Sequence, residues 1–423
     1  MARCATCHAK LPQNGWEWCS ACGSSVVPDI REWKLAPRSE PSKRRPRVET
    51  IISSAQGRRR SRRSTLAVLI SVVIVALAGI AIGAIEAGIV GEAELFPAYD
   101  SAVGRYGFID KNGSMVIQPQ FTEVGPFSEG LAAVTDGDVW GFIDKQGEMV
   151  IPMWLDQASA FSEGLAAVNV GGEHGFIDQT GEFVIWPALP GAQPFSDDLS
   201  AVILRSEATS GWGYVDRTGE LVIQPVSMSV SPFSEGLAAV WMRNENGAMR
   251  WGYIDRTGKM AIPARYYAAE PFSEGLAAVW MGDDLAHLWG YIESSGAFVI
   301  DAQFADAQSF SEGLAAVKVE AGSEYSGYGY VDSSGTMVIE PRFWDAGAFS
   351  QGLAPVQPRA RSGDFRWGYI DRRGTLVIPA QFATAEPFLS GGLAPVTLDK
   401  DGMEHAYVDT EGNIVYQWVT AAE

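Results

Sequence analysis

A motif that returns at nearly constant intervals constrains this chain more than any other feature. The copy WGYIDRTG at 251–258 returns with small changes from residues 106, 140, 174, 212, 289, 328 and 367, and a degenerate copy, HAYVDTEG, begins at 405. The motif glycines are 34, 34, 38, 39, 38, 39 and 39 residues apart, at 107, 141, 175, 213, 252, 290, 329 and 368. Such a period predicts an array of similar modules, each packed on its neighbours.

Each module is predicted to be a small β-meander with three clear strands and one weak strand. The Asp side chain of the motif can accept a hydrogen bond from the backbone N–H two residues later. The following Gly suits the left-handed position of a type I turn with a G1 bulge, so the motif is predicted to be a β-hairpin. Proline, as at Pro263, is expected to end the second strand. A segment such as RYYAAEPFSEG then turns the chain again, and LAAV begins another strand.

Two recurrent apolar positions are expected to form the core, because burying one such side chain contributes roughly 1.5 to 3 kcal/mol. They are a Phe at 127, 161, 195, 233, 272, 310, 349 and 388, and the Leu that follows it at 131, 165, 199, 237, 276, 314, 353 and 393.

The pattern WGYID-x-x-G-x-x-VI-x-P-x-F followed by PFSEGLAAV resembles the WG (also called KWG) repeat family of bacteria, over about Leu95 to Val419. The resemblance implies a β-repeat interaction surface and implies no known reaction. Departures from the pattern suggest drift, and the last of them suggests a C-terminal cap: Asp197-Asp198-Leu199-Ser200, Gln351, Ser390 and Ala406.

The fold class is therefore an all-β repeat array at 94–419, closed in one of two ways. Eight units of about 40 residues would make a propeller-like ring. An open β-solenoid is the rival. The excess ninth hairpin, Tyr407 to Tyr416, fits a cap of the open form and a closing strand of the ring.

Recurrent polar and aromatic residues of the array have structural and functional interpretations. The motif Asp could bind calcium or act as acid and base, but one carboxylate per loop favours turn capping. The Glu of FSEG is expected on a solvated turn face that could recruit cations, and the motif Trp could stack on sugars but is expected to pack between units.

With histidines at 174, 287 and 405 in different units, we predict no catalytic residues and no cofactor-binding residues. The acidic and aromatic sets are Asp110, Asp144, Asp178, Asp216, Asp255, Asp332, Asp371, Asp409, with Glu293 as the exception; Glu129, Glu163, Glu235, Glu274, Glu312; and Trp140, Trp212, Trp251, Trp289, Trp367.

All four cysteines lie in the first 22 residues, as Cys4, Cys7, Cys19 and Cys22. Two Cys-x-x-Cys pairs suit one tetrahedral structural Zn²⁺, with a pair of disulfides or redox thiols as the alternative. CATCHAKLPQNGWEWCSACG resembles the zinc-ribbon heads at the N-terminus of many bacterial membrane proteins. His8 is a conceivable substitute ligand, although four cysteines already complete the shell.

The charge of the chain also differs between its N-terminal segment and the remaining residues. Residues 1–65 carry 14 Lys+Arg against 5 Asp+Glu, whereas the rest carry 18 against 46. Residues 29–65 have the composition of a disordered basic linker, suited to anionic lipids or, less well, to nucleic acid. Leu66 to Ile85 are twenty residues without a charge, so 66–90 is predicted to be a transmembrane helix rather than a cleaved signal peptide.

The positive flank of that span predicts a single-pass plasma-membrane protein with residues 1–28 cytoplasmic and the repeats outside. We expect a non-catalytic interaction or sensing protein whose repeats bind an envelope protein or cell-wall polysaccharide. A transmembrane regulator whose ribbon engages nucleic acid or a cytoplasmic protein, and a glycan-active surface enzyme, are the alternatives.

The zinc interpretation makes a direct prediction. Because four thiolates would form one closed structural site, residues 1–30 should bind one Zn²⁺ per chain and release it to a chelator. Elemental analysis before and after dialysis against EDTA measures this, and a metal-free fragment with two disulfides would contradict it.

Overall fold

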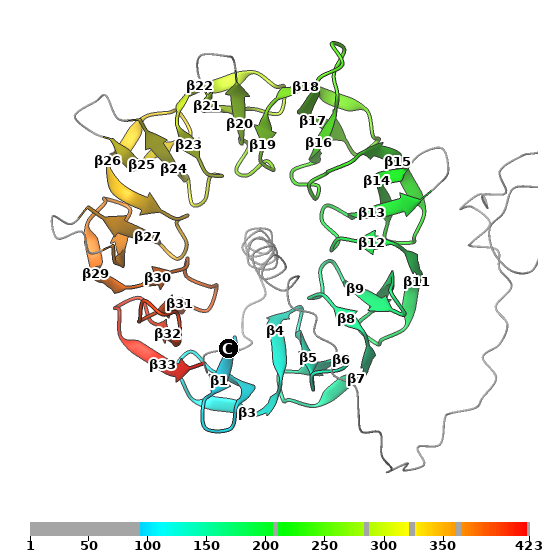
Figure 1. Cartoon of the computed structure of the whole chain (residues 1–423), viewed down its shortest axis with the longest axis vertical. Helices are drawn as coiled ribbons and strands as arrows, with labels where there is room; N and C mark the ends of the chain where they lie inside the picture. The colour runs from blue at the N-terminus through cyan, green and yellow to red at the C-terminus, as the bar shows by residue number, and fades with distance from the viewer. Residues whose placement is uncertain (1–93, 206–209, 283–286, 321–325, 360–364, 421–423) are drawn as a thin grey trace, which may run out of the picture. The chain divides into compact units, whose positions relative to one another are not determined.

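The structure is a computed structural model that describes residues 94–205, 210–282, 287–320, 326–359 and 365–420. These residues belong to the second of the chain's two units, Gly83–Glu423, and form antiparallel β-sheets arranged around a ring (Figure 1). There are eight sheets, and the seven-stranded one is two sheets joined through a shared strand, so the ring has nine blades.

The blades follow one another in chain order. Blades 1 to 3 contain β1 (Phe96–Asp100), β2 (Arg105–Ile109), β3 (Met115–Phe121); β4 (Glu123–Ser128), β5 (Leu131–Thr135), β6 (Trp140–Asp144), β7 (Met149–Leu155); and β8 (Gln157–Ala158), β9 (Leu165–Val170), β10 (Glu173–Asp178), β11 (Phe183–Leu189). Blades 4 to 6 contain β12 (Gly191–Ala192), β13 (Leu199–Arg205), β14 (Ser210–Asp216), β15 (Leu221–Ser227); β16 (Leu237–Arg243), β17 (Met249–Asp255), β18 (Met260–Tyr266); and β19 (Ala268–Ala269), β20 (Ala277–Gly282), β21 (His287–Ile292), β22 (Phe298–Phe304). Blades 7 to 9 contain β23 (Asp306–Ala307), β24 (Leu314–Val319), β25 (Gly327–Asp332), β26 (Met337–Ala346); β27 (Leu353–Pro358), β28 (Trp367–Asp371), β29 (Leu376–Phe382); and β30 (Thr384–Ala385), β31 (Ala394–Thr397), β32 (Glu404–Val408), β33 (Ile414–Val419).

Each full blade is a meander whose first strand lies innermost and whose last strand lies on the rim (Figure 1). The innermost strands β8, β12, β19, β23 and β30 have two residues each, which confirms the expectation of three clear strands and one weak one. In the shared strand β26, the part up to Phe343 pairs with β25 of blade 7, and the part from Phe343 to Ala346 pairs with β27 of blade 8.

The ring is closed by packing between its first and last blades. Nine clusters of buried apolar side chains each combine two consecutive blades, and one of them joins Leu393 and Tyr407 of blade 9 to Phe96 of blade 1. An open array of nine blades would have one interface fewer. Ser101 Oγ also donates to the Val419 carbonyl and accepts from the Val419 N–H, both at 2.8 Å. The solenoid alternative and the eight-unit count are therefore both wrong.

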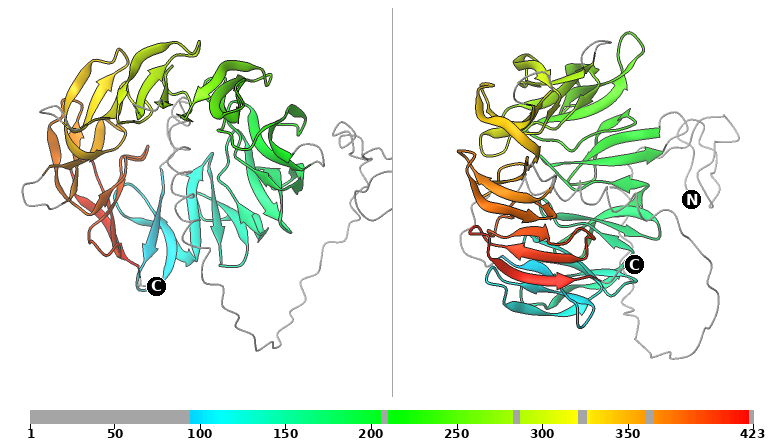
Figure 2. Two further views of the ribbon diagram at one scale, coloured as in Figure 1. Left: turned by 45° about the horizontal axis from the view of Figure 1, so that its top comes forward. Right: turned by 60° about the vertical axis from the view of Figure 1, so that its left-hand side comes forward.

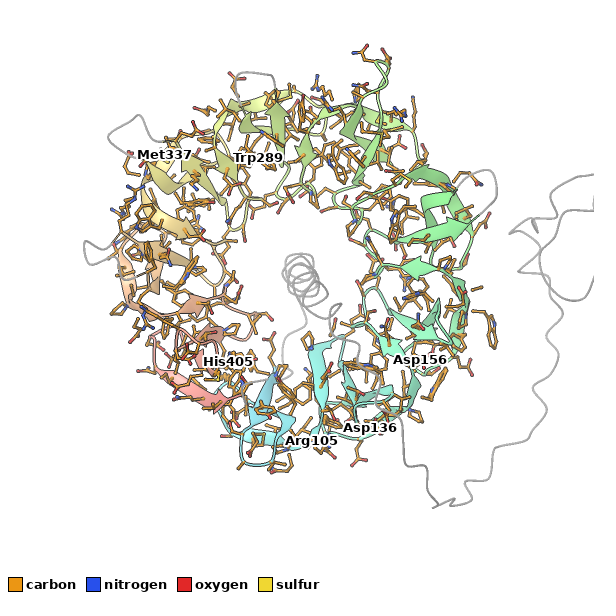
Figure 3. All side chains as sticks on the ribbon, in the orientation of Figure 1. Arg105, Asp136, Asp156, Trp289, Met337 and His405 are labelled. Carbon is orange, nitrogen blue, oxygen red and sulfur yellow. The ribbon has the colours of Figure 1, made fainter. Side chains whose placement is uncertain are left out.

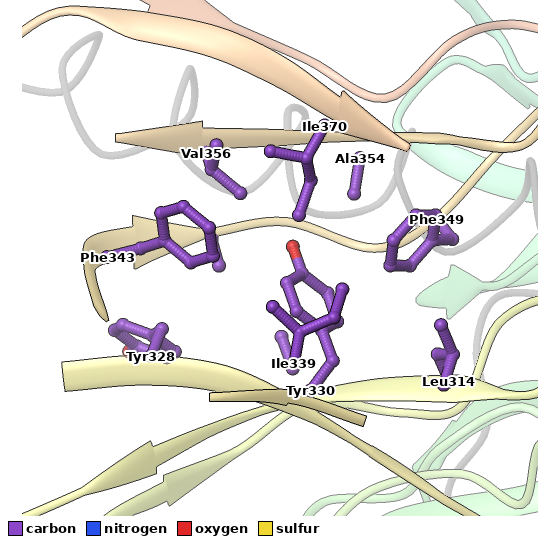
Figure 4. Packing of buried hydrophobic residues seen from close by; sticks show 11 residues of the cluster. Leu314, Tyr328, Tyr330, Ile339, Phe343, Phe349, Ala354, Val356 and Ile370 are labelled. Carbon is purple, nitrogen blue, oxygen red and sulfur yellow. The ribbon is translucent and has the colours of Figure 1, made fainter. Parts of the chain in front are cut away.

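An aromatic pair recurs at the blade interfaces. The third residue of the motif, Phe or Tyr, meets the recurrent Phe of the next blade, as in Tyr330 with Phe349 at 4.9 Å between ring centroids. Figure 4 shows this pair in the cluster between blades 7 and 8, surrounded by Ile339, Val356 and Ile370. Edge-to-face pairs of this kind contribute about 0.5 to 1.5 kcal/mol beyond the area they bury. The recurrent Phe and Leu are thus core residues, as predicted.

The motif turn has the predicted geometry. In blade 5, Gly258 N–H donates to the Asp255 carbonyl at 2.8 Å, Asp255 N–H donates to the Lys259 carbonyl at 2.9 Å, and Gly258 has a φ of 79°. These bonds define a type I turn with a G1 bulge. Gly258 occupies the left-handed position of the turn, which glycine adopts without steric strain.

Proline does not end the second strand of the hairpin, contrary to the prediction. Tyr253 pairs with Ile262 and Trp251 pairs with Tyr266, so Pro263 lies in a bulge and the ladder resumes beyond it. The bulge brings the outer strand against the motif glycine. A Cβ on Gly252 would lie 2.7 Å from backbone atoms of Ala264 and from the Ile262 carbonyl oxygen. Glycine is therefore required at position 252, because the two strands approach each other too closely there for a side chain.

The ninth copy is a complete blade and not a cap. Ala406 stands where the other copies have glycine, and in this hairpin Ala406 pairs directly with Gln417 and His405 with Trp418. Without the bulge at this point the outer strand does not press on residue 406, so a methyl group fits.

The zinc-ribbon residues Cys4, Cys7, Cys19 and Cys22, the basic linker and the span at 66–90 lie outside the described residues. Within the described part of the chain, a search for a helix long and apolar enough to cross a membrane finds none.

The bulge makes Gly252→Ala a test of this fold. Strand propensity alone predicts that alanine stabilises the chain by about 0.5 to 1 kcal/mol, whereas the contact with Ala264 and Ile262 predicts a loss of about 1 to 3 kcal/mol. Urea unfolding of residues 94–423 measures the difference. Ala406→Gly, at the position without a bulge, should lose no more than about 1 kcal/mol; a stabilised Gly252→Ala variant would contradict the close approach.

Candidate interaction surface

The ring has two faces, because the strands of each blade run between them and every connection lies at one end or the other (Figure 2). The FSEG turns and the motif turns share one end of the blades, and we call this the turn face. The connections from the second to the third strand, and the crossings between blades, share the other end, which we call the loop face.

Serine side chains tie neighbouring blades together on the turn face. The Ser of the FSEG turn donates its hydroxyl to the carbonyl of the recurrent Phe in the next blade, for example Ser273 to Phe310 at 2.8 Å. The same bond joins Ser128 to Phe161, Ser162 to Phe195, Ser196 to Phe233, Ser234 to Phe272, Ser311 to Phe349 and Ser350 to Phe388.

The Glu of the FSEG turn is also used within the ring, which corrects the expectation of a merely solvated face. Glu274 Oε2 accepts from the Gly313 N–H of the next blade at 2.8 Å. Glu129, Glu235 and Glu312 make the same bond to Gly164, Gly275 and Gly352. Glu163 accepts from the Asp198 N–H, and Asp197 substitutes for Glu by accepting from the Gly236 N–H. Successive turns pack so that the backbone N–H of the residue after Glu points at the acidic side chain of the corresponding turn in the preceding blade.

Arginines of the motif turns add contacts on the same face. Arg256 donates to the Asp197 carbonyl at 2.6 Å and lies 3.1 Å from Asp198 Oδ2, and Arg372 contacts Glu312. Exposed ion pairs of this kind contribute little each. Together with the Ser and Glu bonds, these contacts leave many recurrent polar groups of the turn face bonded to other residues of the ring.

The motif aspartates cap their own turns, as favoured from the sequence. Asp255 Oδ1 accepts from the Thr257 N–H at 2.9 Å, the Thr257 hydroxyl at 2.5 Å and the Lys259 N–H at 3.1 Å. The Thr257 hydroxyl bond holds the pKa of Asp255 below its usual value. Where Glu293 replaces Asp, Ser295 bridges to the backbone by donating to Glu293 and accepting from the Ala297 N–H.

The histidines and acidic residues of the described repeats do not form a cluster suited to holding a metal ion. Among the described residues, no three His, Cys, Asp or Glu side chains gather to hold a metal ion. His174 lies beside Asn169 in blade 3, while His405 stacks on Trp418 in blade 9. Glu270 and Glu386 directly follow the inner strands β19 and β30. Partial burial among protein atoms raises the pKa of both carboxyl groups, although both side chains keep an exposed surface.

The motif tryptophans pack between blades, as the sequence favoured. Trp140, Trp212, Trp251, Trp289 and Trp367 are partly buried, and each lies against the cluster between its own blade and a neighbour. Their ends reach the loop face, where the chemistry of the blades diverges.

Three positions meet at the loop end of each blade: the residue at the crossing from the preceding blade, the fifth residue counted from the recurrent Leu, and the first residue of the motif. In blade 6 these are Tyr267, Trp280 and Trp289, joined by the bond from the Tyr267 N–H to the Trp280 carbonyl and by Cα pairing of the two tryptophans. In blade 3 the same positions hold Asp156, Asn169 and His174. One scaffold therefore presents aromatic groups on one blade and polar groups on another.

At these positions blade 6 has three aromatic residues and blade 5 has two, and blade 8 also has two, of which Trp344 contacts the exposed Phe365 at 5.9 Å. Arg250 of blade 5 lies 3.7 Å over the ring of Tyr267, Tyr267 lies 5.5 Å from Trp280, and Trp280 stacks near Trp289 at 6.5 Å and 16°. At the equivalent positions of blade 5, Met228 is 69% and Trp241 37% exposed. We call Met228, Trp241, Arg250, Tyr267, Trp280 and Trp289 the blade 5–6 patch.

The opposite part of the ring differs in character. Figure 3 shows Trp289 on one side and Asp136 and Asp156 on the other. Asp156 Oδ2 accepts from the Gly171 N–H at 2.6 Å, so this acid closes a tight loop instead of offering an aromatic surface.

A second exposed aromatic group lies on the rim. Trp154 on β7 contacts Phe183 on β11 at 5.7 Å, and Phe183 contacts Trp186, which is 71% exposed. The patch and this rim group both escaped the sequence analysis, which followed the constant positions of the repeat. The signal that could have found them is the large apolar residue at a position that is small or polar in other copies.

The fold and this surface define a class: a β-propeller built from repeats, with an internal network on one face and variable side chains on the other. The family model for the WG containing repeat matches residues 106–139, 140–173, 175–205, 212–244, 251–283, 289–321, 328–357 and 367–400. These segments cover more than half of the chain, which belongs to the WG repeat family.

Comparison with curated proteins finds no match. Among solved structures, the chain is similar to KlHsv2 with loop 6CD replaced by a Gly-Ser linker, with 10% identity, a TM-score of 0.34, and coverage of 66% of this chain and 91% of that one. It is also similar to the β-propeller domain of the Trilobed protease from Pyrococcus furiosus, with 11% identity, a TM-score of 0.35, and coverage of 62% and 97%. The tricorn protease matches with 12% identity, a TM-score of 0.32, and coverage of 79% of this chain and 44% of that one.

The capping aspartates predict a loss of stability in acid. The pKa of Asp110, Asp178, Asp255 and Asp332 is lowered in the fold, so their contribution is present above the unfolded-state pKa of about 3.9 and is lost as the pH falls through the folded value. Thr257→Val removes the hydroxyl donor, so residues 94–423 should be less stable than the unchanged chain at about pH 6, and the difference should shrink as the pH falls through the folded pKa of Asp255. Urea unfolding between about pH 6 and pH 2.5 checks this, and superimposable profiles for the two chains would contradict it.

Proposed function

We propose that this protein is a membrane-anchored interaction or sensing protein whose WG-repeat ring binds an envelope protein or cell-wall polymer outside the cytoplasm, without catalysing a reaction. One observation carries the proposal. The recurrent Ser, Glu and Asp side chains are engaged in bonds within the ring, whereas exposed aromatic side chains occur at positions that vary between copies. Exposed apolar groups of this kind commonly mark interaction sites.

The anchor and its orientation rest on the sequence. The predicted span 66–90 contains a charge-free run at 66–85 with arginines on one flank and acids on the other, which supports a single helix with the N-terminus in the cytoplasm. The basic linker at 29–65 would then lie near anionic lipid head groups. Cys4, Cys7, Cys19 and Cys22 would hold one structural Zn²⁺ in a reducing compartment, which is where free thiolates persist.

Site-specific crosslinking in intact cells tests the proposal. The full chain should carry a photoreactive residue in turn at three places: position 267 on the loop face, position 186 on the rim and position 111 on the turn face. We expect at least one position to give a discrete product with an envelope component, and the loop-face position to give more than position 111. Absence of any product from all three positions would contradict a binding function.

A further inference from the structure

The blade 5–6 patch concentrates the side chains that protein interfaces favour. Trp, Tyr, Met and Arg are enriched in interface cores and hot spots. The chain has 11 Met and 14 Trp in all. Met228, Met242, Met249 and Met281, together with Trp241, Trp251, Trp280 and Trp289, all lie at the loop ends of blades 5 and 6 or at the crossing into blade 5.

Four residues of the patch form a connected surface across blades 5 and 6. The contacts run from Arg250 to Tyr267, from Tyr267 to Trp280 and from Trp280 to Trp289. Trp241 is 37% exposed at the same loop end, but it pairs with Trp251 while Met242 pairs with Arg250, so Trp241 and Arg250 lie on opposite faces of the β16–β17 hairpin. A Cβ on Gly282 would lie 2.8 Å from the Tyr267 ring, so the ring packs closely against this glycine.

The patch also has a charge preference. Arg250 of the patch and the neighbouring Arg243 lie on the β16–β17 hairpin, and no carboxylate of the described residues lies within ion-pair distance of either guanidinium. Their contacts in that part of the chain are instead with the Gly247 and Met249 carbonyls and with the Tyr267 ring. Guanidinium groups in such a place suit the bidentate recognition of a carboxylate.

The shape of the surface favours a protein chain over a sugar. Arg250 lies over the Tyr267 ring at 3.7 Å, and the Trp280 ring is tilted by 56° to it at 5.5 Å, so these two rings do not form one flat platform for a sugar ring. Methionines adapt their flexible thioether side chains to the anchor residues of a peptide.

We infer that the blade 5–6 patch binds a peptide segment of a partner protein that presents aromatic or aliphatic anchors beside an acidic residue, with the acid on Arg250 and the anchors on Trp241, Tyr267 and the surrounding methionines. This inference rests on the proposed function and names the class of partner and its place on the ring.

The experiment uses the full chain, purified in detergent and immobilised, to select from a phage-displayed library of random peptides. We expect enriched peptides that combine apolar anchors with Asp or Glu. A synthetic copy should bind about tenfold more weakly or worse to Trp241→Ala and Tyr267→Ala, a loss of about 1.4 kcal/mol. Arg250→Gln should weaken a peptide that contains Asp but leave its Asn counterpart unchanged.

Two further variants keep the test sharp. Tyr267→Phe retains the ring over Gly282 and should retain binding, whereas Trp186→Ala removes a more exposed aromatic from the rim and should also retain it. No enriched peptide, equal binding to Trp241→Ala, or dependence on Trp186 would overturn the inference. Binding of chitohexaose that is lost in Trp241→Ala would overturn it in favour of a glycan.

The two proposals can fail separately. Crosslinks to an envelope component from position 186 or 111, with none from 267 and no selected peptide, would leave the binding function and remove this site. Peptides that bind the patch without any crosslinked product in cells would leave the site and remove the proposed function.

Discussion

The ring depends on one contact, the packing of the motif Phe or Tyr against the recurrent Phe of the next blade. No blade can bury its own motif aromatic, because that side chain points out of its sheet into the neighbouring one. Tyr291 illustrates the arrangement: it meets Phe310 of blade 7 at 4.8 Å and donates its hydroxyl to the Gln308 carbonyl at 2.7 Å. The fold is consequently a sum of nearest-neighbour interfaces, and its stability requires that the last blade also find a partner.

That requirement explains the ends of the array. The first blade has no inner strand among the described residues, and the last blade has a straight hairpin with alanine in place of glycine. Neither end exchanges a strand with the other, so closure relies on Phe96, Leu393 and Tyr407 together with the Ser101 bonds. The serine and glutamate bonds of the turn face stop short of this junction. The junction of blades 9 and 1 thus uses a different set of contacts from the interfaces inside the array.

Function and fold use different positions of the same repeat. Asp255, Ser273 and Glu274 recur because each satisfies backbone groups of a turn, and groups occupied in this way have little left to offer a ligand. The loop-end positions have no such bond that recurs in every blade, although Asp156 does accept from the Gly171 N–H. They accept Asp156 in one blade and Tyr267 in another without changing the strand pairing, so binding chemistry can vary while the ring remains the same.

The sequence by itself determined the repeat, its hairpin, its turn-capping aspartates and its core aromatics, because these follow from local backbone geometry and from one period applied many times. It also supplied Cys4, Cys7, Cys19, Cys22 and the apolar span, which remain predictions outside the described residues. The tertiary structure alone decided that nine blades close into a ring, that Pro263 sits in a bulge against Gly252, and that Glu274 bonds across to Gly313. Each of these depends on the angle between neighbouring blades, and a one-dimensional pattern carries no angle. The blade 5–6 patch is of the same kind, since residues as far apart in the chain as Met228 and Trp289 are brought to one end of two adjacent sheets only when the ring has formed.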